Sequence, residues 1–283
     1  MFTTSYKCVK RNVMSKLLKN FLADYGYNIV ALPKTDIKPL FLLCQEADSV
    51  SPLESSLSEL FTSDELALPT VMNNNATADV IGSTAVSFDS ETGVSVLSWL
   101  LDKLKLGKLQ GKMNLDSNKV LTFKYEQVKE DKIDLVKLDG YLSTAAPVTK
   151  GFNTFKTKLM NSELYVINSV LKSNTCTLTI EDKGGASAEV EATIKGIAEI
   201  SQNIKSNSSN SVTITNPGTE LLVFAFKAQH ILYKKASFWD KLFGAGEGVG
   251  AFTIKNETGL VYKGPEDYPT EHLGVLDGSS VDL

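Results

Sequence analysis

The sequence predicts an α+β protein whose main feature is an antiparallel β-sheet. Many short segments alternate apolar and polar residues, which is typical of strands with one buried face. Several of these segments are joined by short polar turns, and only antiparallel neighbours can be joined so tightly. A few other segments repeat apolar residues at helical spacing. With 283 residues, 42% of them hydrophobic, the chain is long and apolar enough for a substantial core.

Four segments are predicted to be helices. From Ser15 to Tyr25 the apolar side chains fall on one face, and Gly26 ends the segment. Val94–Leu106 places leucines on one side with lysines close by, whereas Ser51–Leu60 and Gly151–Asn161 are shorter. Ser15–Tyr25 and Val94–Leu106 are amphipathic and carry lysines, so each could either pack on a sheet or lie at a membrane interface.

The remaining periodic segments are predicted to be strands. They are Tyr27–Leu32, Leu40–Cys44, Ala76–Ser90, Val120–Val128, Leu164–Leu171, Thr175–Glu181, Ser187–Lys195, Ala198–Lys205, Ser211–Thr215, Leu221–Tyr233 and Phe252–Ile254. Turns at Asp182–Gly185 and Asn207–Asn210 predict two consecutive hairpins, and Asn73–Asn75 predicts an exposed loop. Such alternating strands suit either a sheet with one wet face or the wall of a barrel.

The composition changes near Phe243 and divides the chain into two parts. Residues 1–243 form the predicted main domain, and residues 244–283 form a linker and a polar tail. The linker contains alternating glycines, at Gly244, Gly246, Gly248 and Gly250. Because no Lys-Ser or Lys-Thr follows them, a flexible linker is favoured over a nucleotide-binding loop.

The charge balance argues against nucleic-acid binding. The net charge is -4, and Arg11 is the only arginine among 29 basic residues. Arginine is the residue that most often reads guanine edges, so a nucleic-acid partner is not expected. The preference for lysine reflects either genomic base composition or diffuse contacts with anionic lipid.

The cysteines and the hydropathy predict a soluble protein of the cytoplasm. Cys8, Cys44 and Cys176 form no CxxC pair, which suits a reducing compartment. The N-terminus lacks the apolar core of a secretory signal, and no apolar run approaches the ~20 residues of a transmembrane helix.

Residues suited to catalysis are scarce. The two histidines, His230 and His272, have no partner at metal-ligand spacing, and no GxSxG motif occurs. His230 lies in an apolar strand, which favours a structural role. We therefore predict a protein that is not an enzyme and that holds no metal or cofactor.

Two stretches of the sequence resemble bacterial gasdermins. One is Gly26–Leu40 (GYNIVALPKTDIKPL), preceded by a short predicted helix, and it resembles the opening of that family. The other is Leu222–Ala228 (LVFAFKA), which resembles the end of the family's pore-forming region. The length of the chain and the order of its elements agree with the family over most of the sequence.

The resemblance implies a twisted central antiparallel β-sheet with peripheral amphipathic helices and a short autoinhibitory C-terminal segment. It implies a pore-forming domain at 1–243 and an inhibitory tail within 244–283. A caspase-like or other protease would remove the tail. Many copies would then enter the inner membrane, oligomerise as a β-barrel pore and kill the cell in antiphage defence. Closure into a barrel satisfies every strand edge in lipid, and it needs no catalytic residue.

On this basis two segments are expected to become membrane hairpins. The first is about Ala76 to Val128, where the Val94–Leu106 helix would refold into strand. The second is about Leu164 to Lys195. The apolar positions expected to face lipid in the second hairpin are Val166, Ile180, Val190 and Ile194.

The resemblance also suggests a lipidated cysteine and a cleavage site. Cys8 is the only match to the family's lipidated cysteine, but it lies further from the N-terminus than in the family. An unmodified cysteine therefore stays open, as does a true start at Met14 that would remove Cys8. Cleavage is expected between Gly244 and Lys263, because glycine-rich loops are readily nicked. A caspase-type sequence at Leu276–Gly278 would release too short a fragment.

Two other functions remain open from the sequence. One is a non-lytic structural or interaction protein, such as a phage or secretion-system component. The other is an enzyme whose site the sequence does not disclose.

Overall fold

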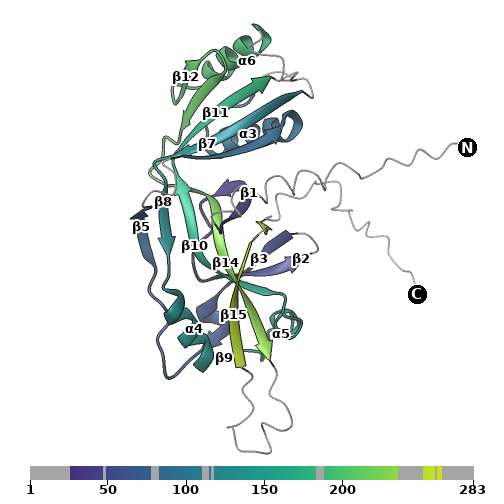
Figure 1. Cartoon of the computed structure of the whole chain (residues 1–283), viewed down its shortest axis with the longest axis vertical. Helices are drawn as coiled ribbons and strands as arrows, with labels where there is room; N and C mark the ends of the chain where they lie inside the picture. The colour runs from purple at the N-terminus through teal and green to yellow at the C-terminus, as the bar shows by residue number, and fades with distance from the viewer. Residues whose placement is uncertain are drawn as a thin grey trace, which may run out of the picture.

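The computed structural model describes residues 26–46, 49–77, 83–109, 115, 118–182, 188–234, 251–258 and 260–262. The molecule is elongated, with a five-stranded sheet at one end and a nine-stranded sheet over the rest of its length (Figure 1). The nine-stranded sheet has the order β15-β14-β1-β16-β3-β2-β10-β8-β5, and the five-stranded sheet has the order β12-β13-β11-β7-β6. The predicted α+β class with a large, mainly antiparallel sheet is confirmed.

The strands of the nine-stranded sheet are β1 (Asn28–Lys34), β2 (Phe41–Glu46), β3 (Ser49–Ser56), β5 (Met72–Ala76), β8 (Lys129–Lys132), β10 (Leu164–Ser173), β14 (Leu222–Lys234), β15 (Ala251–Glu257) and β16 (Val261–Tyr262). Those of the five-stranded sheet are β6 (Ser83–Asp89), β7 (Lys119–Glu126), β11 (Thr175–Asp182), β12 (Ile204–Ser208) and β13 (Ser211–Thr215). The short strands β4 (Phe61–Thr62) and β9 (Ala146–Pro147) form a separate pair. The helices are α2 (Leu57–Leu60), α3 (Ser90–Lys103), α4 (Leu135–Thr144), α5 (Asn153–Met160) and α6 (Ala188–Ala198).

The antiparallel pair β10 and β14 is the centre of the larger sheet. The two strands pair from Leu164 opposite Ile231 to Ser173 opposite Leu222. Both strands are buried along most of their length, because core clusters lie on both of their faces. This double burial explains why their sequences are nearly continuous apolar runs instead of alternating ones.

Six strands of the larger sheet close into a ring, which we call the strand ring. Its neighbours in order are β14, β1, β16, β3, β2 and β10, and β10 pairs again with β14. One core cluster takes residues from all six strands and so fills the ring. Its buried members are Val30, Ile37, Leu43, Val50, Tyr165, Ile167, Val170, Val223, Phe226, Ala228 and Tyr262.

A second core lies outside the ring, under the short helices. Residues of α2, α4 and α5 pack there against Leu42, Leu164 and Val166 of the sheet. Asp134 is the N-cap of α4, because its carboxylate accepts hydrogen bonds from the backbone amides of Val136 and Lys137.

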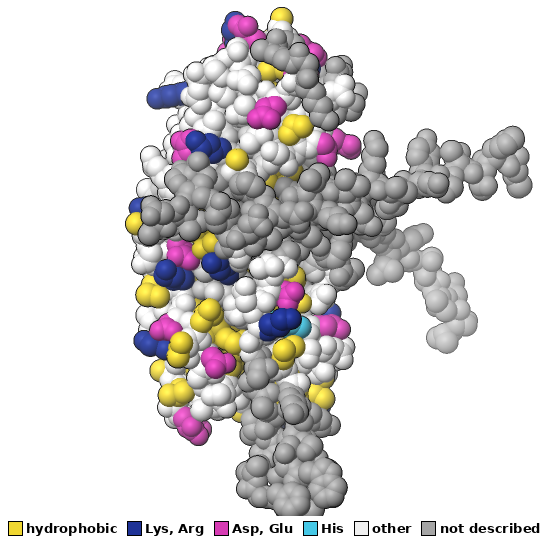
Figure 2. Space-filling view, in the orientation of Figure 1, with side chains coloured by type: hydrophobic (Ala, Val, Ile, Leu, Met, Phe, Trp, Pro, Cys, Tyr) yellow, Lys and Arg dark blue, Asp and Glu magenta, His cyan; other side chains and the backbone are white. Residues whose placement is uncertain are grey.

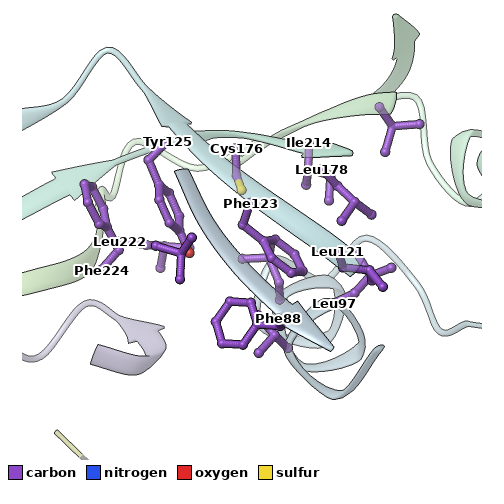
Figure 3. Close-up of a cluster of buried hydrophobic side chains, with 14 of the residues drawn as sticks. Phe88, Leu97, Leu121, Phe123, Tyr125, Cys176, Leu178, Ile214, Leu222 and Phe224 are labelled. Carbon is purple, nitrogen blue, oxygen red and sulfur yellow. The ribbon is translucent and has the colours of Figure 1, made fainter. Parts of the chain in front are cut away.

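The five-stranded sheet buries one face only. On β7 and β11 the inward residues include Leu121, Phe123, Leu178 and Ile180, which pack with residues of α3 and α6 (Figure 3). The intervening residues of both strands are partly or fully exposed, and all but Val120 are polar. Near the junction with the larger sheet, Tyr125 stacks on Phe224 of β14 at a centroid distance of 4.1 Å, so one core joins the two sheets.

A buried ion pair fixes the start of α6. The Lys119 side chain is only 2% exposed, and its Nζ lies 2.6 Å from Glu189 Oε2. A buried ammonium is costly unless it is paired, so this contact holds α6 against the first residue of β7.

The predicted strand Ser187–Lys195 is wrong. Residues 188–198 form α6, and the hairpin expected across Asp182–Gly185 does not exist, because β11 pairs with β7 and β13. Val190 and Ile194 fit both an alternating and a helical period over so short a window. Ile197, which is buried beside them, fits only the helical one.

Other boundaries also differ from the predictions. Residues 51–56 belong to β3, so only Leu57–Leu60 of the predicted helix is helical. Of the predicted strand Ala76–Ser90, Ser83–Asp89 forms β6 and Ala76 is the last residue of β5, and the expected Asn73–Asn75 loop lies within β5. Of Ala198–Lys205, only the last two residues belong to a strand. The sequence reading also missed β8 and α4, and it did not anticipate that β16 pairs in parallel.

The predicted helices Val94–Leu106 and Gly151–Asn161 are confirmed as α3 and α5, with small shifts at their ends. The predicted helix Ser15–Tyr25 lies outside the described residues.

Gly93 is expected to allow the close packing of α3 against β7. A Cβ at this position would lie 2.6 Å from the Leu121 Cβ of β7, so Gly93→Ala should lower the free energy of unfolding by about 1–3 kcal/mol. Thermal and urea denaturation would measure the change. The control is Gly196→Ala on α6, where nothing lies within 4 Å and a gain of up to about 1 kcal/mol is expected. Equal effects of the two substitutions would contradict the close approach of α3 to β7.

Candidate functional site

The site lies where residues 251–262, here called the C-terminal segment, join the larger sheet. The first part of the segment, β15, pairs antiparallel with the second half of β14, from Ala228 opposite Glu257 to Lys234 opposite Ala251. The first half of β14 presents the same edge to β1. One long strand therefore serves both the main domain and the C-terminal segment.

The second part of the segment completes the strand ring. β16 pairs in parallel with β1, where Ile29 and Val30 lie opposite Val261 and Tyr262. On its other side Tyr262 lies opposite Val50 of β3. Among the described strands, β16 is the one that links β1 to β3, so the ring is open without it.

Asn28 binds the connection between β15 and β16. The side chain is 1% exposed, its Nδ2 donates to the Glu257 carbonyl at 3.0 Å, and its Oδ1 accepts from the Leu260 amide at 2.8 Å. A single buried amide thus satisfies a donor and an acceptor of the segment's backbone. These bonds fix the position of β16 along β1.

Tyr262 anchors the segment in the interior of the ring. Its ring is 4% exposed and meets Phe226 edge to face at 6.3 Å, with Lys34 Nζ 5.2 Å from the ring centroid. Leu260 packs against the same cluster, so Leu260 and Tyr262 together bury apolar surface of the segment inside the ring.

A second amide contact holds β15. The Gln229 side chain of β14 is buried, and its Nε2 lies 3.2 Å from both Asn168 Oδ1 and Asn256 Oδ1. Tyr165 of the neighbouring β10 has a raised pKa, because it is buried and because the Glu257 carboxylate lies nearby. The segment is thus recognised by buried polar groups as well as by strand pairing.

A network of hydrogen bonds around the Glu130 carboxylate lies next to this site. Glu130 of β8 accepts hydrogen bonds from Tyr27, at 2.9 Å, and from Ser169, at 2.6 Å, and it pairs with Lys132. Burial opposes ionisation of Glu130, but these bonds outweigh it and lower the pKa of the carboxyl group. Lys227 Nζ lies 4.1 Å from the Tyr27 ring centroid, and burial lowers the pKa of this lysine. Tyr27 directly precedes Asn28, so the network orients the start of β1.

The described residues show an arrangement suited to binding. Within them no cluster of histidine, cysteine, aspartate and glutamate is placed to hold a metal ion. Cys176 is buried, which raises the pKa of its thiol. His230 has the structural role predicted for it, since its Nε2 lies 2.6 Å from the Ser162 carbonyl and its ring stacks on Tyr165. In the part of the chain that the structure covers, no helix is both long and apolar enough to cross a membrane.

Comparison with known proteins identifies the family. The family model described as "Bacterial Gasdermin Family" matches residues 30–246. The gasdermin bGSDM of Gillisia limnaea is 43% identical over 260 residues, which cover 92% of this chain and 97% of that protein. The chain belongs to the bacterial gasdermin family. It is therefore a member of a family of pore-forming effectors rather than of enzymes.

Other relatives are more distant. A gasdermin bGSDM from an unknown prokaryotic organism is 30% identical over 94% of this chain and 98% of that protein. The solved structure of a bacterial gasdermin from Bradyrhizobium tropiciagri has a TM-score of 0.48 and 15% identity, and it covers 88% of this chain and 92% of that one.

The structure separates the site residues predicted for this gasdermin. Val166 and Ile180 lie buried in β10 and β11, on different sheets, whereas Val190 and Ile194 are buried on α6. The expected second hairpin, Leu164–Lys195, ends in the middle of α6, and its strands β10 and β11 do not pair with each other. Cys8, Met14, His272, the Leu276–Gly278 sequence and the linker glycines Gly244, Gly246, Gly248 and Gly250 lie outside the described residues.

Sequence reasoning missed the two side chains that define the site. The sequence predicts Asn28 only as part of the strand Tyr27–Leu32, and Tyr262 only as part of the polar tail. A polar residue within an otherwise apolar strand is a signal for a buried hydrogen bond, and Asn28 fits it. The Leu260–Tyr262 triplet was too short to be distinguished as a strand.

Asn28→Asp is expected to loosen the C-terminal segment. The carboxylate cannot donate to the Glu257 carbonyl, and the loss of one buried hydrogen bond costs about 1–3 kcal/mol. Amide hydrogen exchange of residues 251–262 should rise, with smaller changes in the five-stranded sheet. Asn73→Asp, an equivalent change at an exposed site, is the control. Unchanged exchange in the segment would contradict the role of Asn28.

Proposed function

We propose that this gasdermin is an autoinhibited pore-forming effector activated by proteolytic removal of its C-terminal segment. The observation that carries the proposal is that β16 links β1 to β3 and so completes the strand ring. A protease, caspase-like or other, cuts between Gly244 and Lys263, with the glycines Gly244 to Gly250 as its preferred target. The cut protein then moves from the cytoplasm to the inner membrane, where it oligomerises as a β-barrel pore and causes cell death in antiphage defence.

Cleavage lowers the fraction of molecules with the segment bound, because the segment loses its effective concentration while its affinity stays the same. Before cleavage the linker keeps the segment near its seat, at an effective concentration of about millimolar. After cleavage the segment is held only by its noncovalent contacts, which are the strand pairing of β15 and β16, the bonds to Asn28 and Gln229, and the contacts of Tyr262. Dilution of the free peptide then favours the open ring.

The five-stranded sheet provides strands suited to the pore wall. Its inward face is apolar, whereas its outward face carries Ser87, Thr122, Lys124, Thr177 and Thr213, several of which are hydrogen-bonded across strands. In a pore the first face meets lipid and the second lines the water-filled lumen. For this to happen, α3 and α6 leave the apolar face that they now cover.

This topology refines the membrane segments of the proposal. The first is built from β6, α3 and β7, within Ala76–Val128. The second extends beyond Lys195 to β13, because α6 interrupts it as α3 interrupts the first. Within it Ile180, Val190 and Ile194 face lipid, whereas Val166, the fourth expected position, stays with β10 in the larger sheet. Cys8, when acylated, anchors the N-terminus to the same membrane.

Two cleavage positions test the activation step. A site for the same sequence-specific protease is inserted either within residues 244–250 or after Lys263. Only the first cut should release dye from liposomes, because only that cut frees β15 and β16. The uncut proteins provide the baseline. If neither cut protein releases dye from the liposomes, the chain is better described as a non-lytic interaction protein.

A charge reversal tests which face lines the lumen. Lys124 is exposed on the outward face of β7, so Lys124→Glu should fold normally and shift the K⁺/Cl⁻ permeability ratio of the pore toward cations by about twofold. Reversal potentials in a planar bilayer under a KCl gradient measure the shift. Lys156→Glu, on the exposed face of α5, should leave the ratio unchanged. A shift toward anions, or none, would argue against this orientation of β7.

A further inference from the structure

The ion pair at the start of α6 joins this helix to a distant strand of the five-stranded sheet. Lys119 of β7 is buried, and its Nζ lies 2.6 Å from Glu189 Oε2 in the first turn of α6. The body of α6 lies against β12 and β13, at the edge of the sheet opposite β6 (Figure 1). The ion pair therefore extends the attachment of α6 across β11 to β7.

A second ion pair on α6 lies in a different environment. Glu191 and Lys195 pair one turn apart along the helix, and both side chains are exposed. Figure 2 shows acidic and basic side chains next to each other on the surface of the end that carries α6. An exposed pair contributes little to stability, whereas a buried ammonium that loses its carboxylate is strongly destabilised. Loss of the Glu189 carboxylate should therefore loosen α6, and loss of the Glu191 carboxylate should not.

The buried pair requires α6 to be helical. β11 and β13 pair in one continuous register as far as the bond from the Ile180 amide to the Asn210 carbonyl, at 2.8 Å. A strand that continues β11 in phase beyond this point places every odd-numbered residue on the outward face, where Thr179 lies. Glu189 would join that face, whereas Lys119 lies on the inward face of β7. Conversion of α6 into strand therefore separates the two charges.

The loss of this contact favours the helical state. Asp182 lies opposite Lys119 in the pairing of β11 with β7, and that pairing does not depend on α6. An interaction present in both states shifts no equilibrium, whereas one made only in the helical state stabilises that state relative to the other. Glu189 supplies the contact that is made only in the helical state.

We propose that the Lys119–Glu189 ion pair is a latch that holds α6 on the five-stranded sheet and slows its conversion into strand. The inference rests on the proposed function, in which α6 becomes part of the second membrane segment. It adds a second restraint to that of the C-terminal segment. The segment closes the ring of the larger sheet, whereas the ion pair lies in the five-stranded sheet, so each restraint can be changed without the other.

Two alanine substitutions in the first turn of α6 test whether the pair holds the helix. Glu189→Ala removes the carboxylate beside the buried Lys119 ammonium, whereas Glu191→Ala removes the same charge from the exposed pair. In the uncut full chain, Glu189→Ala should raise amide hydrogen exchange of residues 188–198 about tenfold or more and leave that of residues 90–103 unchanged. Glu191→Ala should match the parent. Addition of Lys119→Met to Glu189→Ala should return the exchange toward the parent value, because no buried ammonium remains.

Dye release from liposomes then tests whether the pair limits the conversion. The parent and both variants carry a protease site within residues 244–250 and are cut under the same conditions. Glu189→Ala should shorten the half-time of dye release about threefold or more, and Glu191→Ala should leave it unchanged. Equal exchange in α6 for the two variants overturns the latch. Faster exchange without faster dye release also overturns it, because the pair would then only stabilise the folded protein.

The cut parent separates failure of the latch from failure of the proposed function. If the cut parent releases no dye, the proposed function fails, and control of pore formation by the ion pair fails with it. If the cut parent releases dye, and Glu189→Ala and Glu191→Ala release it equally fast, only the latch is overturned.

Discussion

The pairing of β10 with β14 is the interaction on which the rest of this gasdermin depends. One edge of each strand pairs with the other strand. The second edge of each pairs with two further strands, one after the other along its length. β10 presents its second edge to β2 and then to β8, and β14 presents its own to β1 and then to β15. Because both strands are buried on both faces, their position is fixed by cores on either side. Both strands belong to the strand ring, the outer helices pack against β10, and Phe224 of β14 contacts the five-stranded sheet.

The sharing of the β14 edge explains how so short a segment contacts both the end of the larger sheet and the strand ring. β15 adds strand pairing at the end of the sheet, whereas β16 contributes only two residues but occupies a place between two strands of the ring. The buried contacts of Asn28 and Tyr262 give those two residues a defined position. Removal of the segment therefore affects the ring and the sheet edge together.

The sequence predicted the fold class and most of the strands with strong periodicity. Prediction failed where one pattern fits two structures, as in α6, whose buried Val190 and Ile194 satisfy strand and helix periods alike. It also failed where the partner is distant in the chain. β8 is short and charged, and it is a strand because Glu130 and Asp131 find partners in β10 and β5. The C-terminal site depends on contacts between residues 28 and 257, and no local pattern encodes such a pairing.

The separation of Asn28 from Glu257 along the chain also bears on how the protein is made. Contacts between residues so far apart form late, since the intervening chain must be synthesised and ordered first. Every other strand of the ring leaves the ribosome before β16. A newly made molecule therefore passes through a state in which its ring is complete except for the last strand. The closed ring is thus the last feature of the fold to form during biosynthesis, so the rate at which β16 docks sets how long each new copy has an open ring.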